Sequence, residues 1–277
     1  MRSTAQNAEL ALLLEVASTP KPGNVDREHE YPDLRFEQFV AGAVGAADGL
    51  AIAGDGGPVG EAFERAIAGM SDQRGGNTQF GAVLLVTPLA AAAADGPLTP
   101  ETARAVAEAT TVEDAVGFYS AFDHVDVAVD DPPSEMEVPD VRRGSDAAAA
   151  LREEGTTLYD VMVESAEIDG LAAEWTSGFP RTFETARKIE GREGPVTDRA
   201  AAVFLELLAE EVDTFVVTQH DVATAREVKR RAEAALDGEQ SVHGLAEEFV
   251  DRGINPGTTA DIVAGGVFIA LERGLEL

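Results

Sequence analysis

The stretch from Ala82 to Ala94, AVLLVTPLAAAAA, decides the fold class of this chain. It is the longest apolar run in the sequence, and only Thr87 and Pro88 interrupt it. A helix that crosses a bilayer needs about 20 apolar residues, so this run is too short to span one. It therefore predicts a buried helix, which we place at 79–94.

On both sides of this run, apolar residues recur at the spacing of a helix. Leu10, Leu13 and Leu14 share one face of a first helix, and Phe36 and Phe39 begin the same pattern in a second. The pattern predicts further helices at 59–70, 101–109, 112–122, 146–153, 158–176, 197–210, 221–236, 242–251 and 259–273.

Strand signals are few. Residues 212–218 are read as a short strand or an extended connector, and the Asp- and Pro-rich segment 123–145 predicts an exposed loop or insertion. Length alone allows one all-helical domain or two small ones. Since this segment does not read as a domain boundary, we expect an all-α fold, a single multi-helix globular domain over residues 1–277.

The charge of the chain is extreme, with 51 acidic residues against 21 basic ones and a net charge of -30. Such a charge repels nucleic acid and anionic lipid, so we expect neither partner. The acids are spread along the whole chain, which favours an adaptation to high salt, where self-repulsion is screened. There is no cysteine, which removes disulfides and thiolate sites. No signal peptide is evident, and we expect a soluble cytoplasmic protein.

Three segments place Thr just ahead of an acidic residue at a predicted helix start: 110–114, 156–160 and 258–261. Each of them fits a helix cap, because Thr followed three residues later by an acid resembles a capping box. Together they also fit a phosphate site, because helix starts present free N–H groups and carboxylates can hold the magnesium that accompanies a triphosphate. On this second reading Asp114 and Asp261 are the candidate metal ligands.

Two further segments carry polar groups in unusual loops. Lys21 lies in TPKPGNV (19–25), where two prolines and a glycine end the first helix; it is either part of a plain turn or a phosphate ligand. Asn77 precedes the helix at 79–94 and either caps that helix or binds a sugar hydroxyl or a metal. The segment 255–259 has the same ambiguity before the last helix.

In order along the chain, these motifs resemble the triphosphoribosyl-dephospho-CoA synthase family, with this chain as a divergent, haloarchaeal-type member. The matching pieces are TPKPGNVD at 19–26 with His29 and Asp33, GGNTQFG at 75–81, TTVEDA at 110–115, YDVMVESAEIDGLAAEWTSGF at 159–179, DT at 213–214 and INPGTTAD at 254–261.

The resemblance implies an all-α transferase that uses ATP with Mg²⁺. Adenine leaves C1′ of the ATP ribose, and the 2′-hydroxyl of dephospho-CoA replaces it. Such chemistry needs a carboxylate near an oxocarbenium-like ribose and a base for the hydroxyl. Under this resemblance we expect catalytic roles for Asp160, Asp169 and Asp33, and metal binding by Asp114 and Asp261. The expected nucleotide- and phosphate-binding residues are Lys21, Asn24, Asn77, Thr78, Thr258 and Thr259.

The chain also departs from the family pattern. Gln79 and Phe80 stand where members carry a His-Lys pair, and residues 218–221 replace basic and glycine residues. A phosphoribosyl-type transferase with a different coenzyme-like acceptor is therefore an alternative, and a non-catalytic helical nucleotide-binding protein is another. Self-association is left open.

Overall fold

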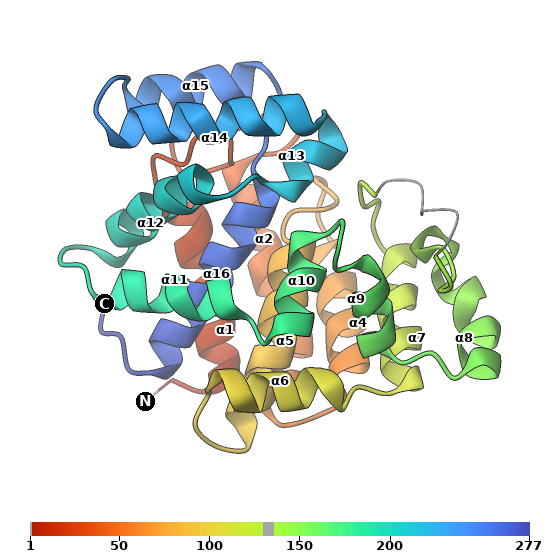
Figure 1. Cartoon of the computed structure of the whole chain (residues 1–277). Helices are drawn as coiled ribbons and strands as arrows, with labels where there is room; N and C mark the ends of the chain where they lie inside the picture. Colours follow the sequence, from red (N-terminus) through yellow and green to blue (C-terminus); the bar gives the residue numbers. More distant parts are fainter. Residues whose placement is uncertain (1, 130–135) are drawn as a thin grey trace.

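The computed structural model describes residues 2–129 and 136–277, and its regular structure is helical throughout (Figure 1). Within these ranges there are sixteen α-helices and two 3-10 segments. Their bounds are α1 Thr4–Ala17, α2 Phe36–Gly45, α3 Ala47–Gly54, α4 Val59–Met70, α5 Phe80–Ala94, α6 Pro100–Glu108, α7 Val112–Ser120, η1 Ala121–Asp123, η2 Val141–Ala147, α8 Ala148–Glu154, α9 Leu158–Ser165, α10 Gly170–Ser177, α11 Pro180–Glu190, α12 Val196–Glu210, α13 Thr214–Gln219, α14 Val222–Leu236, α15 Val242–Asp251 and α16 Gly257–Glu272.

The all-α, single-domain prediction is confirmed. One large cluster of buried apolar side chains takes members from α1, α5, α7, α12 and α16, so helices from both ends of the chain share a core. None of the helices in the described ranges combines the length and the apolar content needed to cross a membrane.

Helix α16 lies at the centre of this core, where α1, α5, α11 and α12 pack around it (Figure 1). It is apolar on nearly every side, as expected of a helix that is buried all round. Gly265 and Gly266 let α11 approach closely: a Cβ atom on Gly266 would lie 2.3 Å from Cγ2 of Thr185. This close contact holds α11 against the central helix.

Helix α5 is the buried helix predicted from the apolar run, and it continues through Pro88. Proline has no N–H, so it cannot donate to the carbonyl of Leu84, four residues earlier. The indole Nε1 of Trp175 donates to that carbonyl instead, at 3.2 Å. The fully buried Trp175 therefore satisfies the backbone group that the proline leaves free and ties α10 to α5.

Two sequence predictions are wrong in detail. The helix expected over 158–176 is two helices, because Asp169 accepts hydrogen bonds from the N–H groups of Leu171 and Ala172 and so starts α10 anew. The strand or connector expected at 212–218 contains the short helix α13, which Asp213 caps through the N–H of Val216. Both errors arise where a capping aspartate begins a helix inside an apolar pattern.

The loop expected at 123–145 is irregular between the two 3-10 segments η1 and η2 where it is described. Part of it, including Asp130, Asp131, Pro132 and Pro133, lies outside the described residues.

Candidate active site

A cavity of about 430 Å³ opens where the first residues of α5, α10, α13 and α16 meet. Its lining has a polar and an apolar part. The polar wall consists of residues that include Glu15, Asn24, Asn77, Asp169, Thr214, Asn255, Thr258 and Asp261. The apolar part contains Phe80, Leu84, Phe118, Phe122, Val161 and Met162. The cavity thus offers hydrogen-bonding and acidic groups together with an apolar surface.

Two helices begin at the polar wall, and side chains from outside each helix accept hydrogen bonds from part of its first turn. Helix α5 starts after Gln79, where Oδ1 of Asn77 accepts from the N–H of Phe80 at 3.2 Å. Helix α16 starts after Pro256, and the N–H of Thr259 donates to the carboxylate of Asp213. The positive end of each helix dipole favours anions. The described lining of the cavity therefore offers a phosphate two positive helix ends and no cationic side chain.

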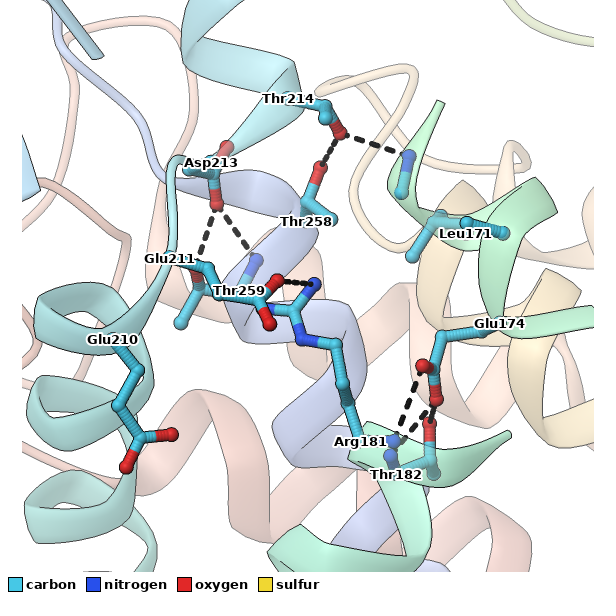
Figure 2. A network of polar contacts seen from close by, with 12 residues as sticks. Leu171, Glu174, Arg181, Thr182, Glu210, Glu211, Asp213, Thr214, Thr258 and Thr259 are labelled. Atoms are coloured by element: carbon cyan, nitrogen blue, oxygen red, sulfur yellow. Dashed lines mark hydrogen bonds and ion pairs between the residues drawn. The ribbon is translucent and has the colours of Figure 1, made fainter. Parts of the chain in front are cut away.

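A polar network fixes the starts of α10, α13 and α16 relative to one another (Figure 2). The carboxylate of the buried Asp213 accepts hydrogen bonds from the N–H of Thr259 at 2.8 Å and from its hydroxyl at 2.7 Å. The hydroxyl of Thr214 contacts that of Thr258 at 3.0 Å and accepts a hydrogen bond from the N–H of Gly170 at 3.1 Å. Asp213 and Thr214 therefore hold three chain segments, which are far apart in sequence, in fixed positions at the cavity.

The acidic groups in and behind the polar wall repel one another. Burial raises the pKa of Asp261 well above its usual value, and the nearby charges of Glu15, Asp213 and Asp169 raise it further. Burial also raises the pKa of Asp169, against two backbone hydrogen bonds that lower it, although its side chain still faces the cavity. Perturbed carboxyl groups gathered in one cavity are typical of a functional site.

Asp261 reaches this position because α5 carries a glycine opposite it. A Cβ atom on Gly81 would lie only 2.0 Å from Oδ2 of Asp261. A backbone hydrogen bond from Ala82 also acts on the Asp261 carboxyl and lowers its pKa against the larger effects of burial and charge. The carboxyl group therefore packs directly on the first turn of α5.

Lys21 is fully buried behind this wall and does not line the cavity. Its ammonium group forms an ion pair with Glu15 and donates to Oδ1 of Asn24 at 2.8 Å. It also lies 5.9 Å from the centre of the Phe204 ring. The two partners of Lys21 line the cavity, whereas Lys21 itself lies one layer deeper.

The structure brings six of the predicted site residues to the cavity. They are Asn24, Asn77, Thr78, Asp169, Thr258 and Asp261. Lys21 and Thr259 lie behind the wall, where Thr259 donates to Asp213. The structure therefore separates residues that line the cavity from residues that hold them in place.

Three predicted residues are not brought to the cavity. Asp114 accepts from the N–H groups of Gly60 and Thr111, at 2.8 and 2.7 Å, and Asp160 closes a capping box with Thr157. Asp33 is exposed and does not line the cavity. For Asp114 and Asp160 the structure shows the capping role that their spacing also allowed. In the described ranges, no three His, Asp or Glu side chains are grouped as an all-protein metal site.

Sequence reasoning missed Glu15, gave Asp213 and Thr214 no role beyond a motif match, and left Asn255 within the ambiguous segment 255–259. Glu15 interrupts an apolar helix face, which is a signal of a buried acid. The pair Asp213-Thr214 is too short a motif to carry information alone, and only the folded network gives it a role.

Comparison with known proteins agrees with the resemblance drawn from the motifs. The model of the ATP:dephospho-CoA triphosphoribosyl transferase family matches residues 1–276. A search of the curated proteins gave no match.

The fold is similar to the crystal structure of a proposed triphosphoribosyl-dephospho-CoA synthase from Archaeoglobus fulgidus. The two chains share 23% identity with a TM-score of 0.69, over 85% of this chain and 99% of that one. At this identity the likeness shows a shared fold, and the family match over nearly the whole sequence shows the family. The chain belongs to the ATP:dephospho-CoA triphosphoribosyl transferase family and is a transferase.

Proposed function

We propose that the cavity binds ATP and dephospho-CoA together and is where the triphosphoribosyl group is transferred. The observation that carries this proposal is the meeting of two helix starts with the carboxyl groups of Asp169 and Asp261 in one cavity. The positive ends of the helix dipoles favour phosphate groups, and the carboxyl groups stabilise positive charge that develops on a ribose.

The reaction breaks the bond between C1′ and N9 of ATP, and its electron pair leaves with adenine. A new bond joins C1′ to the 2′-oxygen of dephospho-CoA. The hydroxyl proton passes to a carboxylate of the cavity wall and is balanced by the proton that adenine takes up. A carboxylate close to C1′ stabilises the charge that builds there, and we place Asp169 in this role.

The amide groups of the polar wall are suited to the ribose. Asn77 and Asn24 both line the cavity, and an amide can donate to one hydroxyl and accept from another. In the apolar part of the lining, Phe80 and Phe122 meet edge to face with ring centres 5.0 Å apart. We assign this apolar surface to the uncharged parts of the two substrates, where it also keeps water from C1′.

Magnesium fits these residues as an ion shared with the substrate. Mg²⁺ is commonly held by one or two carboxylates together with substrate phosphates and water, and it does not need an all-protein cage. Asp261 would hold it, next to the starts of α16 and α5. When bound, the ion would neutralise the triphosphate in a wall that is otherwise acidic.

The test is to mix the protein with MgATP and dephospho-CoA and to follow free adenine and the coupled product by chromatography and mass spectrometry. Adenine formed in proportion to product supports the proposal. Adenine formed only in the absence of an acceptor would indicate plain hydrolysis, and none under any condition would contradict the proposal.

A second candidate, a different coenzyme-like acceptor, is favoured by one observation. Among the described residues that line the cavity there is no Lys or Arg, so no side-chain cation is in place for the diphosphate of dephospho-CoA. Adenine release that depends on another alcohol-bearing nucleotide, and not on dephospho-CoA, would favour this candidate.

A further inference from the structure

The position of Lys21 departs from what a phosphate ligand requires. Its side chain has no exposed surface, and its ammonium group is committed to Glu15 and to Asn24. A phosphate ligand must reach the substrate, yet Lys21 does not line the cavity. Its charge is therefore directed at two side chains of the wall.

Those two side chains do reach the cavity. Glu15 and Asn24 both line it, and the amide of Asn24 donates onward to Oδ1 of Asn255 at 2.9 Å. Lys21 thus orients a short row of polar groups on the wall. It also supplies a countercharge where one is scarce, because the charged residues that line the cavity are acidic throughout the described part of the chain.

We propose that Lys21 is a positioning residue, which orients Glu15 in the cavity wall and supplies its countercharge, and that Glu15 is the catalytic base. Building on the proposed function, Glu15 takes the proton of the attacking hydroxyl as the new bond to C1′ forms. Adenine leaves with the electron pair of the broken bond and takes a proton from solvent. Glu15 then releases to solvent the proton that it took from the hydroxyl. No other reactant is needed.

The proposal is tested with three variants, Lys21→Met, Glu15→Gln and the double variant Lys21→Met/Glu15→Gln. We expect each single variant to lower kcat for adenine release by about 10²- to 10⁴-fold, the range for loss of a general base. We expect the dissociation constant of MgATP to change by less than about threefold, since neither removed group is then a phosphate ligand. Residues that act as a unit are non-additive, so the double variant should be no slower than the slower single variant.

Folding is controlled for within the same set. Each single variant leaves one buried charge without its partner, which is strongly destabilising, whereas the double variant removes both charges. The double variant should therefore have the highest melting temperature of the three. If the single variants do not fold, MgATP binding to the double variant alone decides between the two roles of Lys21.

A matched control is Lys188→Met, which breaks the ion pair of Lys188 with Glu210 at the surface, at a residue that does not line the cavity. It should leave both kcat and MgATP binding unchanged. MgATP binding weakened by tenfold or more in the double variant would make Lys21 a phosphate ligand and overturn the proposal. So would kcat losses that multiply in the double variant, because Lys21 would then act independently of Glu15.

The binding and melting measurements do not depend on turnover. A wild-type protein that releases no adenine would therefore count against the proposed function, while the positioning role of Lys21 would still be judged by MgATP affinity and by the order of the melting temperatures.

Discussion

Gly81 and Asp261 are in a contact that tolerates no side chain: a Cβ atom on Gly81 would lie 2.0 Å from Oδ2 of Asp261. Two helices distant in sequence, α5 and α16, meet at this point on the cavity wall. The carboxyl group of Asp261 can pack against the first turn of α5 only because residue 81 is a glycine.

Gly81→Ala should therefore displace Asp261 and lower kcat for adenine release by at least about tenfold, because small misplacements at a reacting centre are costly. Gly244→Ala is the matched control, since Gly244 is also helical and its added Cβ would meet nothing closer than 3.6 Å. The control should be active and slightly more stable, by about 0.5–1 kcal/mol. Equal activity of the two variants would contradict the role assigned to the contact.

Asp213→Ala should destabilise the fold by about 2–4 kcal/mol, since it removes a helix cap and leaves the buried hydroxyl and N–H of Thr259 without their acceptor. Urea unfolding measures the change. Asp221→Ala removes an exposed cap of α14 and should cost less stability. A loss at Asp213 no greater than at Asp221 would show that the network does not hold the cavity together.

Asp114→Asn should affect stability, whereas Asp261→Asn should affect MgATP binding. Asp114 uses its oxygens to accept from Gly60 and Thr111, so its replacement should cost about 1–3 kcal/mol of stability with unchanged MgATP binding. Asp261→Asn should instead weaken MgATP binding in a folded protein. Isothermal titration and urea unfolding separate these effects, and weakened binding in Asp114→Asn would restore it as a candidate metal ligand.

Glu174 should make stability fall as pH rises. Burial raises its pKa above the ordinary 4.5, so the folded state holds this proton more tightly than the unfolded chain. Its contribution is complete below about pH 4.5 and is lost as pH rises through the higher folded value. The free energy of unfolding of wild type relative to Glu174→Gln should therefore decrease upward from pH 4.5.

Glu113 is the comparison for Glu174, because its contribution to stability should change with pH in the opposite direction. The hydrogen bond from Arg152 lowers the pKa of Glu113, so wild type should gain stability relative to Glu113→Gln as pH rises toward 4.5. Because Glu113 is exposed, we expect only a small effect. If the stability of wild type relative to Glu174→Gln increased with pH, the assignment for Glu174 would be contradicted.

The melting temperature should rise from low to molar KCl. A net charge of -30 repels itself in the folded state, and salt screens that repulsion. Circular dichroism melts over this range measure the effect, with sucrose as a control for non-ionic stabilisation. A melting temperature that stays flat in KCl would mean that the acidity has another cause.

The sequence by itself determined the helical fold and its buried centre. Apolar residues at helical spacing identified α4, α5, α12 and α14 to within a residue or two, because that periodicity comes from local geometry. The motifs identified the family and six residues of the cavity wall. The motifs did not predict that Lys21 is buried, because a lysine in a loop is ordinarily exposed. Only packing against Phe204 and pairing with Glu15 place its side chain inside the protein.

Tertiary structure alone separated three local patterns that look alike. Thr111 with Asp114 and Thr157 with Asp160 form capping boxes at their own helix starts. Thr258 and Asp261 have the same spacing, yet α16 begins at Gly257, two residues earlier than a helix capped by Thr258 would begin. Asp261 therefore falls beyond the capping position and turns toward Gly81 of α5, while the hydroxyl of Thr258 accepts from the N–H of Phe215. The spacing is a local property, but the use of the carboxylate depends on where the helix starts and on what packs against it.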